Sequence, residues 1–253
     1  MKEDAGRVDD FFEAGIFVID KPAGPTSFKM VSGVRRVLGI KKVGHAGTLD
    51  PFATGLLVVC VGRSATRMIS RMMDGQKEYL ATLCLGVETE TLDPEGAVVA
   101  RNPVGPLRAE QIEDCLRLFR GEQLQVPPIY SALKHQGKPL YHYARQGISI
   151  VKEARSVFID TLERTDGGFD LVGGEGSQLS LRVVCSKGTY IRSLAADIGR
   201  SLGCGAHLTQ LRRIKSGCFT LDQSFPGAEL LLPDAHKRLL AKALSVDDIA
   251  NLL

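Results

Sequence analysis

The chain has 253 residues, of which 44% are hydrophobic and 24% are charged, and its formal net charge is +3 at pH 7. A chain of this length can bury a substantial core, and the composition is ordinary for a soluble globular protein. So small a charge excess cannot indicate nucleic-acid binding by itself; only the distribution of the charges could do so.

The first third of the chain alternates buried strands with short helices. Proline and glycine at residues 21–25 end the first strand, and Gly39 ends a helix that Thr26 or Ser27 can cap. Residues 44–55 have no clean hydrophobic period and include three glycines, which predicts a loop. The expected order is a polar leader at 1–14, a strand at 15–20, a helix ending at 38, that loop, a strand at 56–61, a helix at 65–73 and a strand at 77–85.

The rest of the chain predicts further strands and two longer helices. Ile112, Leu116 and Phe119 share one helical face, and residues 178–185 alternate with the period of two that a strand requires. Residues 123–147 are rich in proline, aromatic and basic residues, and their pattern assigns no element. We expect helices at 109–120 and 191–202 and strands at 155–162, 169–172, 178–185 and 208–215. The mixture predicts an α+β fold, with a mainly antiparallel mixed central sheet flanked by helices and loops.

The sequence carries no sign of a metal site or of a membrane segment. Its six cysteines form no CxxC pair and have no histidine at ligand spacing, so we expect reduced thiols and no metal. The first ten residues lack an apolar signal core, and the longest apolar runs, such as residues 56–61, are too short to cross a bilayer. We therefore expect a soluble cytoplasmic protein that does not bind membranes.

One predicted loop carries a carboxylate within a long, distinctive string. Residues 44–55 read GHAGTLDPFATG, with Asp50 directly before Pro51. An Asp-Pro pair alone is typical of an ordinary turn, in which the carboxylate bonds to nearby backbone amides. The longer string, continued by Leu56 and Leu57, resembles the signature loop of the TruB family of tRNA pseudouridine synthases.

Five further segments resemble motifs of that family, in the family's order. They are residues 15–27 (GIFVIDKPAGPTS), 77–79 (KEY), 125–147 (QVPPIYSALKHQGKPLYHYARQG), 188–194 (GTYIRSL) and 205–213 (GAHLTQLRR). Six ordered motifs that span most of the chain are a far more specific signal than any one of them. The resemblance implies a catalytic domain of the pseudouridine synthase fold at 15–229, with an RNA-gripping insertion at about 123–147.

The resemblance also implies a reaction. Members of the family isomerise the T-loop uridine of tRNA, at position 55, to pseudouridine after the nucleotide is flipped out of its stack. The reaction breaks an N-glycosidic bond, turns the uracil and rejoins it to the ribose through carbon. Because no redox change occurs, we expect no cofactor, which agrees with the lack of a dinucleotide loop or P-loop in the sequence.

Four residues are implied in the catalytic pocket. Asp50 would be the catalytic carboxylate, which attacks the sugar, attacks the uracil ring or removes a sugar proton. Arg192 would keep Asp50 ionised and oriented through a charge-assisted bond. Tyr79 would stack on the target base, with its hydroxyl free for proton work, and Leu211 would line the same pocket. Without the motifs, Arg192 would be read as a surface arginine, Tyr79 as a strand tyrosine and Leu211 as a core leucine.

Contacts with the RNA are expected from side chains around these motifs. His45 would lie beside the flipped nucleotide with a neutral ring, and Tyr190, in the same motif as Arg192, would also bind substrate. Arg67 and Arg71 are four residues apart and would share one face of their helix. The basic residues expected near phosphates are Lys21, Lys41, Lys42, Arg67, Arg71, Lys134, Lys138, Arg145, Arg212 and Arg213.

Residues 230–253 are expected to form a C-terminal tail. Bacterial members of the family continue into a small RNA-binding module of the PUA type, and the resemblance here ends in the connecting region. We therefore expect that module to be absent or truncated. We also expect a monomer whose partner is the T-arm stem-loop of tRNA.

Three alternatives stay open at this level: an RNA-binding or tRNA-folding protein on the same fold, a pseudouridine synthase with another RNA target, and an Asp-dependent nucleoside hydrolase. The joint presence of Asp50, Tyr79 and Arg192 disfavours a pure binding protein, because binding alone requires none of them. Fold similarity cannot choose among the alternatives, since function resides in the site.

Overall fold

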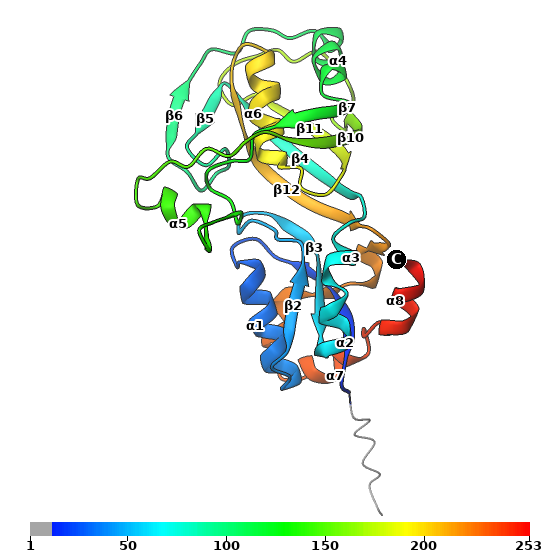
Figure 1. The fold of residues 1–253 in the computed structure, drawn as a ribbon. Coiled ribbons are helices and arrows are strands. Elements are labelled where there is room, and N and C mark those ends of the chain that lie inside the picture. Colours follow the sequence, from blue (N-terminus) through cyan, green and yellow to red (C-terminus); the bar gives the residue numbers. More distant parts are fainter. Residues whose placement is uncertain (1–11) are drawn as a thin grey trace, which may run out of the picture.

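The computed structural model describes residues 12–253 and has one continuous ten-stranded sheet with helices packed against it (Figure 1). Two further two-stranded sheets extend from it. The α+β fold with a mainly antiparallel sheet is therefore confirmed. Most of the leader expected at 1–14 lies outside the described residues; within it, Phe12 packs edge-on against Phe17 at 5.7 Å between ring centroids.

The elements of the first third mostly follow the predicted order. They are β1 (Gly15–Lys21), α1 (Ser27–Leu38), β2 (Val43–Ala46), β3 (Thr54–Val61), α2 (Gly62–Arg67), α3 (Ile69–Met72) and β4 (Lys77–Leu85). Thr26 caps α1, accepting a bond from the Lys29 amide, and Gly39 ends it in the left-handed conformation. Both sequence signals are thereby confirmed.

Two expectations in this third are wrong. The predicted loop at 44–55 begins with strand β2, whose residues 43–46 pair antiparallel with β3. Gly44 interrupts the hydrophobic pattern that would have indicated a strand there. The single helix expected at 65–73 is divided, because the amide of Met68 bonds to the Ala65 carbonyl and tightens the chain there. Arg67 and Arg71 consequently lie on two different short helices, not on one helical face.

The later elements are β5 (Val87–Thr89), β6 (Val98–Arg101), α4 (Ala109–Leu118), β7 (Gly121–Gln125), β8 (Lys134–His135), β9 (Lys138–Pro139), α5 (Leu140–Ala144), β10 (Arg155–Arg164), β11 (Gln178–Cys185), α6 (Ile191–Ser201), β12 (Ala206–Ser216), β13 (Phe219–Thr220), β14 (Phe225–Pro226), α7 (Ala235–Leu240) and α8 (Val246–Leu252). Two 3₁₀ turns lie at Leu221–Gln223 and Gly227–Leu231. The strand expected at 169–172 is wrong: only Leu171 forms a bridge, with Leu107. Glycines at positive φ on both sides of it prevent a longer ladder.

The sheet has two halves that meet beside the predicted catalytic loop. Its strand order is β14-β1-β3-β12-β4-β11-β10-β7, and most neighbours are antiparallel. The parallel pairing of β3 with β12 joins the halves, with Thr54 opposite Arg212 and Gly55 opposite Arg213. The loop that carries Asp50 enters β3 at this junction (Figure 1).

Burial on both faces explains the continuous apolar runs of β1 and β3. Phe17, Ile19 and Leu57 face the main core, to which α1, α4 and α6 contribute their apolar stripes. Ile16 and Val18 face a second cluster on the opposite side, which includes residues from α2, α3 and α8. Strands covered on both faces need no polar alternation, so the sequence reads as uninterrupted hydrophobic residues.

Residues 230–253 pack onto the central sheet and its two cores. Leu239 of α7 and Ile249 of α8 are buried in the two cores. Between these helices, Leu244 exchanges two backbone hydrogen bonds with Ile16 of β1, at 3.0 and 2.9 Å. This segment is therefore an integral layer of the fold.

Two expected features of composition can be compared with the fold. The six cysteines are free thiols, four of them buried. Within residues 12–253, no helix has the length and apolar character needed to cross a membrane.

The close approach of α6 to β12 gives a test of the fold. Alanine would ordinarily stabilise a helix interior by about 1 kcal/mol relative to glycine. At Gly199 of α6, however, a Cβ would lie 2.3 Å from the Ala206 backbone nitrogen. We expect Gly199→Ala to lower the free energy of unfolding by at least about 2 kcal/mol, because the backbone of β12 must move.

Gly33→Ala in α1 is the matched control. Its Cβ would meet only the Leu230 side chain, at 3.1 Å, so stability should change by less than about 1 kcal/mol. Urea unfolding of both variants measures the difference; equal stability of the two would contradict the packing of α6 on β12.

Candidate active site

Asp50 lies in the loop that joins β2 to β3. Buried polar side chains bind the backbone of this loop. Ser27, at the start of α1, contacts the neighbouring residue in the loop. Its Oγ donates to the Leu49 carbonyl at 2.9 Å and accepts from the Leu49 amide at 2.8 Å. The backbone beside Asp50 is thereby fixed to α1.

Lys21 supports the other side of this loop and does not face the substrate. Its side chain is fully buried, and Nζ donates to the carbonyls of Pro22, Pro25 and Pro51 at 2.8–2.9 Å. These three bonds use the three protons of the ammonium group. Burial lowers the pKa of Lys21 to about 8, against the opposing attraction of Asp50 and Glu95. The expectation that Lys21 contacts RNA is therefore wrong; it fixes Pro51 in place.

Arg213 is a second buried cation beneath the loop. Its Nε donates to the Leu56 carbonyl at 2.7 Å, while Nη1 and Nη2 donate to the carbonyls of Thr48 and Gly47 at 3.4 and 3.2 Å. Gly55 passes so close that a Cβ there would lie 2.2 Å from the Arg213 carbonyl oxygen. Arg213 is thus a structural support rather than the phosphate contact that was expected.

Arg212, the neighbouring residue, points elsewhere. Its Nη1 and Nη2 pair with the two carboxylate oxygens of Asp20 at 3.1 and 2.7 Å. The adjacent arginines 212 and 213 look equivalent in the sequence, but the alternation of β12 sends them to different partners.

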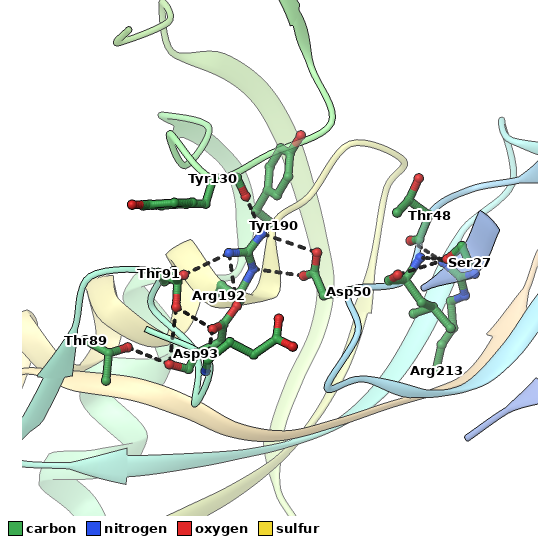
Figure 2. A network of polar contacts seen from close by, with 12 residues as sticks. Ser27, Thr48, Asp50, Thr89, Thr91, Asp93, Tyr130, Tyr190, Arg192 and Arg213 are labelled. Carbon is green, nitrogen blue, oxygen red and sulfur yellow. Dashed lines mark hydrogen bonds and ion pairs between the residues drawn. The ribbon is translucent and has the colours of Figure 1, made fainter. Parts of the chain in front are cut away.

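The Asp50 carboxylate pairs with Arg192 of α6 at two points (Figure 2). Arg192 Nε lies 2.9 Å from Oδ2, and Nη2 donates to Oδ1 at 3.4 Å. Only 4% of the arginine side chain is exposed, whereas 32% of the Asp50 side chain is. The guanidinium is therefore fixed by the protein while the carboxylate remains accessible.

A second carboxylate, which sequence reasoning missed, shares this arginine. Asp93 is buried, and its Oδ2 lies 3.2 Å from Nη1 of Arg192. The backbone amide of Glu95 donates to the other oxygen of Asp93 at 3.0 Å, and the Thr91 hydroxyl contacts that oxygen too. The remaining protons of Arg192 reach the carbonyls of Thr91 and Tyr130, both at 2.8 Å (Figure 2).

The sequence does hold a signal for Asp93. The tetrapeptide TLDP occurs twice, at residues 48–51 and 91–94. The fold brings the two aspartates to opposite sides of one guanidinium. A repeat of the turn sequence around the predicted catalytic residue was thus a usable indication of a second carboxylate.

Burial and neighbouring charges act against each other at Asp50. Burial raises the pKa of Asp50, and Asp93 adds to the increase, while Arg192 and Lys21 oppose it. The net direction is upward from the ordinary value of an aspartate. Arg192 is therefore the principal group that favours the ionised carboxylate.

Asp50 and Arg192 lie in the wall of a cavity of about 410 Å³. Tyr79, Tyr190 and Leu211 also line it, so five predicted site residues meet there. Cavities of this size hold small-molecule groups such as a nucleoside. The hydroxyl of Tyr79 is protonated at neutral pH, since burial raises its pKa against the influence of Arg213.

The cavity wall is strongly basic. Its lining residues include Arg192 and Arg213, and also Lys77, Arg155 and Lys187. Asp50 is the one acidic residue among them. Burial lowers the pKa of Lys77 to about 8. This charge distribution favours an anionic ligand, although the net charge of the chain is small. Sequence reasoning did not assign Lys77, Arg155 or Lys187 to the site.

The other predicted contacts are not in the cavity wall. His45 is half-buried on β2 opposite Val59, and burial lowers its pKa, so the ring is neutral as expected. Arg67 and Arg71 are exposed on α2 and α3, and Nη2 of Arg71 donates to the Ala250 carbonyl of α8 at 3.4 Å. Lys134 is exposed in the hairpin of β8 and β9.

The described residues include no group of three or more His, Cys, Asp or Glu side chains arranged to hold a metal ion. The chemistry that the site offers from its own residues is that of a carboxylate, a guanidinium and a phenol around a nucleoside-sized cavity.

Two family models match the chain. Residues 35–191 match the N-terminal domain of the TruB family of pseudouridylate synthases, and residues 192–239 match the C-terminal domain of tRNA pseudouridylate synthase B. Among curated proteins, tRNA pseudouridine synthase B of Desulfotalea psychrophila is 64% identical over 96% of this chain and 98% of that protein. The protein of the same name from Protochlamydia amoebophila is 47% identical over 85% of this chain and 79% of that one.

Solved structures give the same fold. A chain in a Cbf5-Nop10-Gar1 complex superimposes with a TM-score of 0.69 at 26% identity, over all of this chain and 70% of that one. A chain in an H/ACA RNP bound to a substrate RNA that contains 2'-deoxyuridine gives a TM-score of 0.67 at 26% identity, over 94% of this chain and 61% of that one.

Proposed function

This chain belongs to the TruB family of tRNA pseudouridine synthases, and we propose that it isomerises the T-loop uridine at position 55 with Asp50 as its catalytic carboxylate. The observation that carries the proposal is the pairing of an accessible Asp50 with a buried Arg192 in a basic, nucleoside-sized cavity. A structural ion pair would need neither the exposed carboxylate nor the cavity beside it.

The reaction is an isomerisation in which all atoms are conserved. The bond between N1 of uracil and the ribose breaks, the base turns, and a bond from C5 to the same sugar carbon forms. A proton leaves C5 and N1 gains one. Whether Asp50 attacks the sugar, attacks the ring or removes a sugar proton, it begins as the ionised carboxylate, which is the form that Arg192 favours.

The walls of the cavity can hold the base during this rotation. Tyr79 offers an aromatic face for stacking and a protonated hydroxyl, while Leu211 offers an apolar contact on β12. Neither contact depends on which edge of the uracil is presented. We assign both residues to the uracil, and Tyr190 to the sugar side of the cavity, next to Arg192.

The substrate must leave its stack to reach Asp50. Extrusion of a nucleotide costs a few kcal/mol, which contacts with the flipped residue and its phosphates must offset. Lys77, Arg155 and Lys187 supply positive charge at the cavity. We infer that the T-arm stem-loop is the part of the tRNA recognised, that a monomer binds it in the cytoplasm, and that the insertion at about 123–147 grips it, with Lys134 among the contacts.

We expect Asp50→Asn to abolish turnover while leaving tRNA affinity within about twofold of wild type, because the substitution removes the charge but keeps the shape. The assay uses a T-arm stem-loop with tritium at C5 of the uracil and measures tritium release. Turnover by a clean Asp50→Asn preparation would contradict the assignment. A folded wild type that binds full-length tRNA but releases no tritium from it would favour an RNA-folding function.

We also expect Arg67→Ala combined with Arg71→Ala to weaken tRNA binding. The slope of log affinity against log salt concentration should fall by about 1.5, because each lost phosphate contact removes roughly 0.7–0.9 from it. The matched control removes Arg117 of α4 and Arg200 of α6, two exposed arginines that are paired with Asp114 and Asp197. Identical slopes for both double variants would remove Arg67 and Arg71 from the RNA footprint.

A further inference from the structure

The first part of the insertion, residues 125–131, lies along the first turn of α6 and contacts it at three successive points. Gln125 pairs with the backbone of Tyr190. The Tyr130 carbonyl accepts from Nη2 of Arg192 at 2.8 Å. The Ser193 hydroxyl donates to the Val126 carbonyl at 3.4 Å. Three neighbouring residues of the helix that carries Arg192 are thus bound to one short segment.

Gln125 makes the most specific of these contacts. It is the last residue of β7 and is 5% exposed. Its side-chain oxygen accepts from the Tyr190 amide at 2.7 Å, and its side-chain nitrogen donates to the Tyr190 carbonyl at 3.1 Å. Tyr190 is the N-cap of α6 and receives no cap from its own side chain. Gln125 therefore fixes the backbone two residues before Arg192.

Tyr130 connects the same segment to the loop of the second carboxylate. Its hydroxyl donates to Oε1 of Glu90 at 2.5 Å, three residues before Asp93. Its carbonyl contacts the same Nη2 atom of Arg192 that donates to Asp50. The guanidinium is consequently held by three segments of the chain: the loop of Asp50, the loop of Asp93, and residues 125–131.

We propose that Gln125 and Tyr130 are positioning residues that set the guanidinium of Arg192 and, through it, the ionisation of Asp50. The insertion that grips RNA is thereby coupled to the catalytic carboxylate. This inference rests on the proposed catalytic role of Asp50. Neither residue faces the cavity that holds the base, so each acts on the reaction only through Arg192.

The coupling has a distinctive consequence. When Gln125 no longer fixes the start of α6, the guanidinium is free to move away from Asp50. Arg192 is the main group that opposes the effect of burial on Asp50, so its displacement raises the pKa of that carboxylate. The acidic limb of the pH–rate profile then moves to higher pH, while contacts with tRNA remain. General loss of stability would not move this limb.

The test uses the full chain and compares Gln125→Leu with Gln123→Leu. Gln123 lies on the same strand, and its side-chain nitrogen donates to the carbonyls of Leu118 and Arg120 instead. Single-turnover tritium release at saturating enzyme is measured from acid to alkaline pH, together with tRNA affinity. For Gln125→Leu we expect a rate at neutral pH that is on the order of ten- to a hundredfold lower. Its acidic limb should move to higher pH and its tRNA affinity should stay unchanged.

Tyr130→Phe and Glu90→Gln form a second pair for the case in which Gln125→Leu fails to fold. Tyr130→Phe removes the hydroxyl bond and should slow turnover about fivefold, with the same direction of pH shift. Glu90→Gln keeps an acceptor for the Tyr130 hydroxyl and should therefore retain most of the wild-type rate.

A wild-type rate and pH profile in both Gln125→Leu and Tyr130→Phe would overturn the inference. Slower turnover with an unmoved acidic limb, or with weakened tRNA binding, would overturn it as well, since these residues would then be structural or RNA-binding. Failure of the underlying function is distinguishable, because it would appear as turnover by Asp50→Asn.

Discussion

The site depends on one buried guanidinium that two carboxylates share. Arg192 is almost wholly inaccessible, and a buried cation is stable only when charge and hydrogen bonds compensate for lost solvation. Asp93 and the carbonyls of Thr91 and Tyr130 provide much of that compensation from inside the protein. Asp50 can therefore pair with Arg192 and still keep a third of its side chain exposed to the cavity.

Two further buried cations fix the loop around Asp50 through hydrogen bonds to its backbone. Lys21 and Arg213 together bond to carbonyl groups on both sides of Asp50, from Gly47 to Leu56. Both elements that supply them, β1 and β12, belong to the central sheet. A carboxylate on a loop thus acquires the fixed geometry of the sheet, as a preorganised functional site requires.

Much of this arrangement could be predicted from the sequence, and the failures have physical causes. The bounds of the strands at 77–85 and 178–185 were predicted to the residue, because clear boundaries and, in the second, a period of two define them. The family motifs led to Asp50, Tyr79 and Arg192, which the fold brings to one cavity. The residue type alone could not reveal burial, so Lys21 and Arg213 were assigned to RNA when the fold uses them as internal supports. Asp93 was missed because it lies outside the six family motifs, and only the fold brings it to Arg192.

The central claim is that Arg192 governs the charge of Asp50. The most direct test is a carboxyl ¹³C NMR titration of aspartate-labelled protein, with the Asp50 signal identified by its loss in Asp50→Asn. The account predicts that Asp50 titrates above the ordinary aspartate range, still higher in Arg192→Gln, and lower in Asp93→Asn, because Asp93 raises its pKa. An Asp50 pKa that is unchanged by both substitutions would contradict the account.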